Sequence, residues 1–200
     1  MEQRRFGIQG PAGNIEVHAY DPGEKRRGIA LVAHPHPLFG GTMENKVVQT
    51  LAKSFLELGY LAVRFNFRGV GKSEGIHDSG GGETSDALFL LEYLESREGP
   101  LPLVLAGFSF GGYVQAKVAA VKKPEKLVLV APAVKKFEVP EVAGNPLLIH
   151  GEEDEVIPLQ DLFDWARPQG HVVTVLPGTG HFFHGKLTQI KQIVMNNLKD

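Results

Sequence analysis

The chain has 200 residues, a formal net charge of −2 and no cysteine. This length suits a single domain over residues 1–200, with a core large enough to fold without disulfides or a structural metal. The missing cysteines exclude disulfides, thiolate metal sites and a cysteine nucleophile, and the mixed charges leave no broad basic face for nucleic acid.

The first predicted elements are the two strands of a hairpin. Arg5–Gln9 and Asn14–Tyr20 are separated by the turn sequence Gly10-Pro11-Ala12-Gly13. This pattern predicts an antiparallel hairpin at the edge of a larger sheet.

Six short apolar segments predict the rest of that sheet. Strands that are apolar on both faces are typical of parallel sheets covered by helices on both sides. Apolar residues recur at helical spacing over Val47–Leu56 and again over Leu187–Leu198. The alternation of strands and helices predicts a doubly wound α/β fold. The six predicted strands are Ile29–Ala33, Tyr60–Phe65, Leu103–Ala106, Leu127–Val130, Leu147–Ile149 and Val172–Leu176.

The second of these strands leads into a glycine-rich stretch that resembles a nucleotide-binding loop. Gly71-Lys72-Ser73 matches the end of the phosphate-loop pattern G-x-x-x-x-G-K-[ST], but Asn66 stands where the pattern requires its first glycine. We therefore interpret the stretch as a turn that leaves a buried strand, and we expect neither a nucleotide nor any other cofactor.

A candidate nucleophile follows the third of these strands. Gly107-Phe108-Ser109-Phe110-Gly111 is a G-x-S-x-G nucleophile elbow between a predicted strand and a predicted helix. Glycines are needed because a side chain beside the sharply turned serine would collide with the neighbouring strand and helix. The alternative is a glycine-rich turn with a capping serine.

A serine nucleophile needs a base, and the base needs an acid that orients it. His181 follows the last predicted strand, and His184, expected in the first turn of the last helix, is its competitor. Asp154 lies among four acidic residues after Leu147–Ile149, and its short side chain can be held in one geometry. We therefore predict Ser109, Asp154 and His181 as catalytic residues, in the chain order of this fold.

Together, several motifs resemble the α/β-hydrolase superfamily, and more closely a group of small bacterial hydrolases related to dienelactone hydrolases and acyl-protein thioesterases. The resemblance covers essentially the whole chain. It implies that the glycine-rich stretch is a D-x-R-G-x-G-x-S turn with Asn66 in place of the aspartate and Arg68 as an anchor. Dienelactone hydrolases use a cysteine nucleophile, so Ser109 puts a lactone substrate in doubt. The motifs are HPHPLFGGTMENKVV, RFNFRGVGKSEG, GFSFGG, HGEEDEVIP and GTGHFF.

The oxyanion hole of this superfamily uses two backbone N–H donors. The residue after the nucleophile is Phe110. His34-Pro35 occupies the place of the superfamily's common His-Gly, so His36 is expected to supply the second donor. Pro35 and Pro37 have no N–H, although the two prolines could also serve only to stiffen the loop.

The predicted activity is hydrolysis of carboxylic esters or thioesters of small acyl groups through an acyl-enzyme on Ser109. The segment Pro132–Asn145 is too short for a helical lid, so the cleft should be open. No metal is expected, since His181 and His184 lack the glutamate of a zinc-binding helix. We expect a cytoplasmic protein with no membrane partner. The alternative is a hydrolase-fold binding or scaffold protein with vestigial catalysis.

Overall fold

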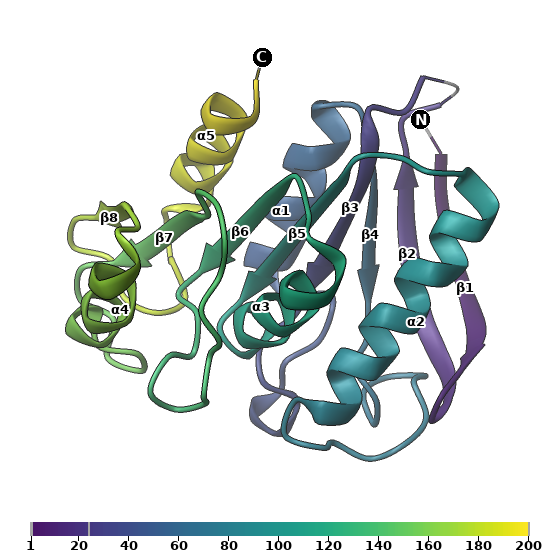
Figure 1. The fold of residues 1–200 in the computed structure, drawn as a ribbon, viewed down its shortest axis with the longest axis horizontal. Helices are drawn as coiled ribbons and strands as arrows, with labels where there is room; N and C mark the ends of the chain where they lie inside the picture. The colour runs from purple at the N-terminus through teal and green to yellow at the C-terminus, as the bar shows by residue number, and fades with distance from the viewer. Residues whose placement is uncertain (1, 24, 200) are drawn as a thin grey trace.

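The computed structural model describes residues 2–23 and 25–199. Their strands form one sheet of eight in the order β1-β2-β4-β3-β5-β6-β7-β8 (Figure 1). β1 pairs antiparallel with β2, β2 pairs antiparallel with β4, and every other pair is parallel. The predicted mostly parallel sheet with an N-terminal antiparallel hairpin is confirmed. The strands are β1 (Glu2–Gly10), β2 (Gly13–Asp21), β3 (Gly28–Ala33), β4 (Tyr60–Phe65), β5 (Leu103–Phe108), β6 (Lys126–Val130), β7 (Leu147–Gly151) and β8 (Val173–Leu176).

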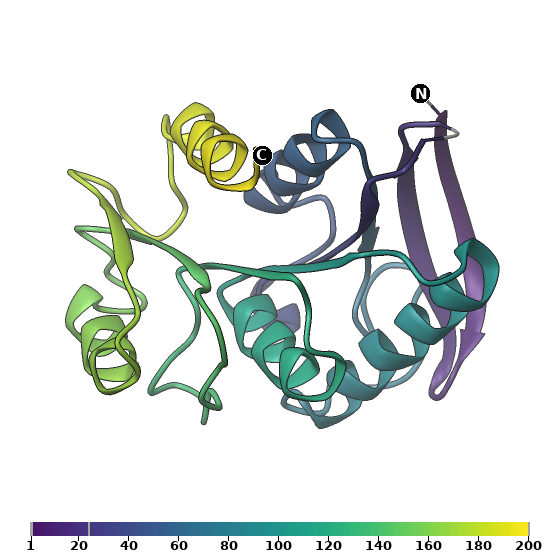
Figure 2. The ribbon, with the colours of Figure 1, turned by 45° about the horizontal axis from the view of Figure 1, so that its top comes forward.

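Helices cover both faces of this sheet, as the doubly wound pattern predicts. Figure 2 shows α1 and α5 side by side on one face, with α2, α3 and α4 on the other. The helices are α1 (Lys46–Glu57), α2 (Gly81–Glu98), α3 (Phe110–Lys122), α4 (Leu159–Ala166) and α5 (Leu187–Leu198), with short 3-10 helices at Pro37–Phe39 and Arg167–Gln169.

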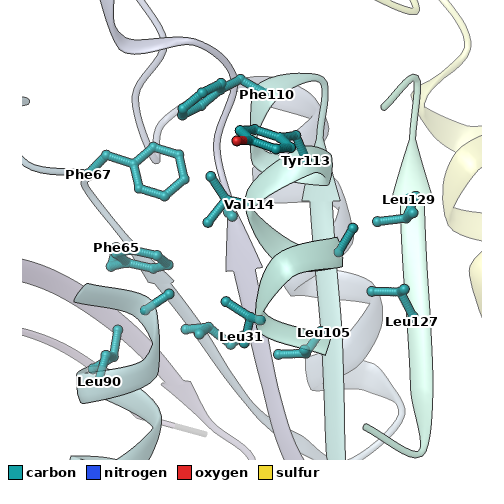
Figure 3. Packing of buried hydrophobic residues seen from close by; sticks show 14 of the residues in the cluster. Leu31, Phe65, Phe67, Leu90, Leu105, Phe110, Tyr113, Val114, Leu127 and Leu129 are labelled. Carbon is teal, nitrogen blue, oxygen red and sulfur yellow. The ribbon is translucent and has the colours of Figure 1, made fainter. Parts of the chain in front are cut away.

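The two faces bury separate apolar clusters. Leu31 and Leu105 of the central strands pack with Val114 of α3 and Leu90 of α2 on one face (Figure 3). On the other face, the apolar side chains of α1 pack against the same strands. α1 covers the predicted stretch Val47–Leu56, and the Asn45 side chain caps it by accepting from Val47 N at 2.9 Å.

Two helices, α2 and α4, were not predicted from the sequence. In α2, Ala87–Leu91 is a continuous run of apolar residues, which hides the helical period. α4 has only eight residues and buries just Leu162 and Ala166, so it is too short to show a period. By contrast, residues 131–146 between β6 and β7 contain no helix, as expected for a fold without a lid.

The glycine-rich stretch forms a turn whose polar groups bond within the protein. Asn66 Nδ2 donates to Glu16 Oε2 at 2.8 Å, and the same oxygen accepts from Lys72 N at 2.8 Å. Arg68 forms two 2.8 Å bonds to the Asp86 carboxylate in α2, and so anchors the turn as the resemblance implied. A carboxylate therefore occupies the position near Lys72 N where a phosphate would have to bind.

Candidate active site

The carboxyl ends of the parallel strands lie close together at one edge of the sheet. Ala33 of β3 is in register with Gly107 of β5, and Phe108 of β5 is in register with Val130 of β6. The loops that follow these strands therefore meet, which is where ligands bind in folds of this type.

Ser109 lies between β5 and α3 with an unusual backbone conformation. Its φ is 55° and its ψ is −117°, a region that residues with a side chain rarely adopt. Its N–H donates to Val130 O at 2.9 Å, and its C=O accepts from Gly112 N at 2.9 Å and Ala133 N at 3.2 Å. Three neighbouring segments thus fix this conformation, and the hydroxyl is directed out of the sheet edge toward His181.

The two glycines of the motif are required by close packing. A Cβ on Gly111 would lie 2.4 Å from Ala33 O at the end of β3. A Cβ on Gly107 would lie 2.2 Å from Gly111 O at the start of α3. The collisions with strand and helix that the sequence predicted are therefore confirmed.

The structure brings Ser109, His181 and Asp154 together in one hydrogen-bonded chain. His181 Nε2 lies 3.1 Å from Ser109 Oγ, and His181 Nδ1 lies 2.8 Å from Asp154 Oδ2. Because a carboxylate only accepts, Nδ1–H is the donor to Asp154, which leaves Nε2 free to accept from the serine hydroxyl. All three residues are buried, so water competes little with this order.

Backbone N–H groups of its own loop hold the Asp154 carboxylate in place. Its Oδ1 accepts from Val156 N at 2.9 Å and from Ile157 N at 2.7 Å, as expected from the turn that follows it. His150, which the sequence did not single out, donates from Nε2 to Ile157 O at 2.8 Å, and its Nε2 lies 3.5 Å from Asp154 Oδ2. Burial lowers the pKa of His150, which favours its neutral form.

The histidines at the end of β3 fix the loop there. His34 is fully buried, and this burial lowers its pKa to about 3. Its Nδ1–H donates to Pro35 O at 2.6 Å, and its Nε2 accepts from Phe67 N at 3.0 Å. The His36 side chain accepts from Leu38 N at 3.2 Å through Nδ1, and burial lowers its pKa too. The loop is thereby tied both to the end of β4 and to its own next turn.

The two predicted backbone donors belong to residues that line the cavity beside the candidate nucleophile. Phe110 is the first residue of α3, so its N–H has no acceptor within that helix. The N–H of His36 donates to no group in residues 2–23 and 25–199. The rings of His36 and Phe110 lie 4.8 Å apart, and both residues line the same cavity as Ser109.

Other histidines lie where the sequence did not place them. His184 is exposed in a turn ahead of α5, which begins only at Leu187, so the expectation that it lies in the helix was wrong. His77, in the loop before α2, contacts the His36 ring at 4.7 Å. Its Nδ1 lies 2.7 Å from Oε1 of the buried Glu83.

Ser109 and His181 open into a cavity of about 650 Å³ with mostly apolar walls. Phenylalanines from three loops and α3 line it, and Phe39 and Phe182 remain exposed at its mouth. In the described chain, no group of three His, Asp or Glu side chains could hold a metal ion. No helix within those residues is long and apolar enough to cross a membrane.

Comparisons with known proteins agree with this fold. A solved α/β serine hydrolase homologue from Coxiella burnetii is 41% identical, with a TM-score of 0.93, and the match covers 100% of this chain and 99% of that one. A serine hydrolase without a lid from Xanthomonas campestris is 34% identical, with a TM-score of 0.92 and coverage of 98% and 94%. An uncharacterised protein of Rickettsia prowazekii is 31% identical, over 96% of this chain and 87% of its own length.

The family model described as serine aminopeptidase, S33, matches residues 26–146, which run from just before β3 to just before β7. This segment contains the nucleophile elbow and the His34–Gly41 loop but not Asp154 or His181. On these matches and on the fold, the chain belongs to this family of α/β-fold serine hydrolases.

Proposed function

We propose that the protein hydrolyses carboxylic esters or thioesters of small acyl groups through an acyl-enzyme on Ser109. The observation that carries this proposal is the buried chain Ser109–His181–Asp154, which opens into an apolar cavity. An acyl chain fits such walls, and the hydrogen-bonded order supplies a nucleophile, a base and an acid that orients the base.

In the proposed reaction, Ser109 Oγ attacks the acyl carbon while His181 Nε2 takes the hydroxyl proton. Asp154 holds the imidazole and stabilises its positive charge. The N–H groups of His36 and Phe110 donate to the oxyanion of the tetrahedral intermediate. His181 then protonates the leaving alkoxide or thiolate as its bond to carbon breaks. Water attacks the acyl-enzyme by the same steps, which releases the acid and restores Ser109.

The cavity favours an ester or thioester over the peptide that the family's description names. An aminopeptidase must hold the protonated amino terminus of its substrate, which calls for a carboxylate close to the nucleophile. The lining of this cavity, among the described residues, includes Lys136 and no Asp or Glu, and a lysine would repel that amino group. Asp154 and Glu83 are buried and already accept hydrogen bonds from the protein, and the exposed Glu155 carboxylate accepts from His181 N at 3.3 Å.

A fluorophosphonate probe tests the proposed nucleophile. We expect one covalent label per chain, located on Ser109 by peptide mass spectrometry, and turnover of a panel of acyl esters and thioesters. Ser73→Ala is a matched control, since Ser73 is buried but its hydroxyl donates to Asn66 O at 2.7 Å. Folded protein that takes no label would favour the alternative of a scaffold with vestigial catalysis.

The backbone role of His36 can be separated from its side chain. His36→Pro and His36→Ala both lose the imidazole, but only proline also loses the N–H. The φ of His36 is −56°, which proline adopts without strain. We expect His36→Pro to lower kcat about a hundred- to a thousandfold, the usual effect of losing one oxyanion donor. His36→Ala should stay within about tenfold of the wild type.

Steady-state kinetics on one ester measure this difference, with thermal unfolding to show that both variants fold. Equal losses in the two variants would mean that the imidazole acts and that the backbone assignment is wrong. Both variants also lose the contacts of the His36 ring with the rings of Phe39 and Phe110, so any effect of this lost packing is common to both.

A further inference from the structure

The cavity beside Ser109 combines apolar walls with one lysine among the described residues that line it. Its apolar lining includes Phe39, Phe110, Phe137, Val156, Ile157 and Phe182. Lys136 lines the same cavity, and no Asp or Glu of the described chain does. Among the described residues, the lining of this cavity therefore offers a ligand one lysine and no carboxylate.

The backbone that carries Lys136 is fixed by contacts on both sides. Phe137 N donates to Ala133 O at 3.1 Å, which closes a tight turn, and Ala133 N donates to Ser109 O at 3.2 Å. The Phe137 ring stacks on Tyr113 of α3 with the ring centres 4.9 Å apart. The turn is thus built directly onto the nucleophile loop, so the backbone of Lys136 has a set position relative to Ser109.

The two adjacent lysines of this turn differ in their partners. The Lys135 ammonium lies 2.9 Å from Asp161 Oδ1 and 2.7 Å from Asp164 Oδ2, so two carboxylates of α4 satisfy its charge. The Lys136 ammonium has no ion pair or hydrogen bond within residues 2–23 and 25–199. Lys136 is an exposed residue of the cavity lining, so its side chain is open to a ligand.

We propose that Lys136 determines substrate preference by binding an anionic group, a carboxylate or a phosphate, on the ester or thioester substrate. This inference rests on the proposed function and names its substrate class: an apolar body that carries an anion. An ammonium without a protein partner gains a charge-assisted hydrogen bond when such a group binds. When the substrate is neutral, the ammonium keeps its hydrogen bonds to water. The anion can belong to the acyl chain or to the leaving group.

Two pairs of esters distinguish these sources. The acyl pair is para-nitrophenyl hexanoate and the para-nitrophenyl half-ester of adipic acid, which have equal chain lengths. The leaving-group pair is the hexanoyl ester of para-hydroxybenzoate and that of its methyl ester. For each pair, the preference is kcat/KM for the anionic ester divided by kcat/KM for the neutral one, measured at low and high salt.

We expect Lys136→Met to lower this preference about five- to thirtyfold in one pair, the range of a partly screened charge-assisted bond. Lys136→Glu should lower it further, and high salt should reduce the wild-type preference. Lys135→Met is the matched control, since Lys135 is adjacent and exposed but paired with α4, and it should leave the preference within twofold. Thermal unfolding checks that each variant folds.

The possible failures can be told apart. Turnover of the neutral esters with an unchanged preference in Lys136→Met, in both pairs, would overturn this inference and leave the proposed function standing. An equal effect of Lys135→Met would also overturn it, because the cause would then be the general surface charge. If wild-type protein turned over none of the four esters, the proposed function and this inference would fall together.

Discussion

Replacing Ser109 or His181 by alanine is expected to lower kcat for ester hydrolysis by roughly three to six orders of magnitude, and the double variant should lose little more. The reason is the hydrogen-bonded chain itself. With no base 3.1 Å away the serine hydroxyl is a poor nucleophile, and without the serine the base has no proton to take. Steady-state kinetics of the two single variants and the double variant measure this dependence.

His184→Ala is the matched control for His181→Ala. His184 is three residues further along the chain and exposed, and it lies outside the hydrogen-bonded chain, so its loss should change kcat by less than about threefold. If Ser109→Ala kept more than a tenth of wild-type activity, the assignment of the nucleophile would be wrong. If His184→Ala were as damaging as His181→Ala, the base would have been chosen wrongly.

The second large effect is expected for Asp154→Asn, which should lower kcat about ten-thousandfold. Asp154 Oδ1 accepts from the N–H groups of Val156 and Ile157, so the oxygen of an asparagine would turn toward these two donors. Its NH2 group would then face His181 Nδ1 and donate to it. The ring proton would move to Nε2, and the imidazole could no longer accept a proton from Ser109.

Kinetics of Asp154→Asn beside Glu153→Gln measure this effect. Glu153 is the preceding acid and is exposed, so its change to glutamine removes one charge from the same loop and should cost less than about tenfold. A loss in Asp154→Asn no larger than that in Glu153→Gln would show that the loop charge matters and the tautomer does not.

The strands were predictable because a strand that is buried on both faces appears in the sequence as a short run of apolar residues. Tyr60–Phe65 and Leu103–Phe108 consist almost entirely of apolar residues, and the structure places both inside the sheet. α1 was predictable because its polar and apolar residues alternate with the helical period. α2 was not, since it begins with Gly81-Gly82 and its apolar residues run on without a period.

The candidate site was predictable only where local sequence fixes the geometry. Gly107 and Gly111 around Ser109 form such a case, because the crowding at a strand-to-helix turn selects glycine. No local sequence pattern of this kind surrounds Lys136 or His77. They come near Ser109 or His36 only through the packing of separate loops, which no spacing along the chain encodes.

The backbone of Ser109 bears on the stability of the whole fold. An L residue held at φ 55° and ψ −117° costs about 1–3 kcal/mol, and glycine would enter this region with less strain. Domains of this size have a free energy of unfolding of only about 5–15 kcal/mol, so the strain at this one residue is a sizeable fraction of it. A chain optimised for folding alone would carry glycine at position 109. The serine therefore makes the fold less stable than glycine would at position 109. This loss of stability falls at the residue where the proposed reaction needs a hydroxyl.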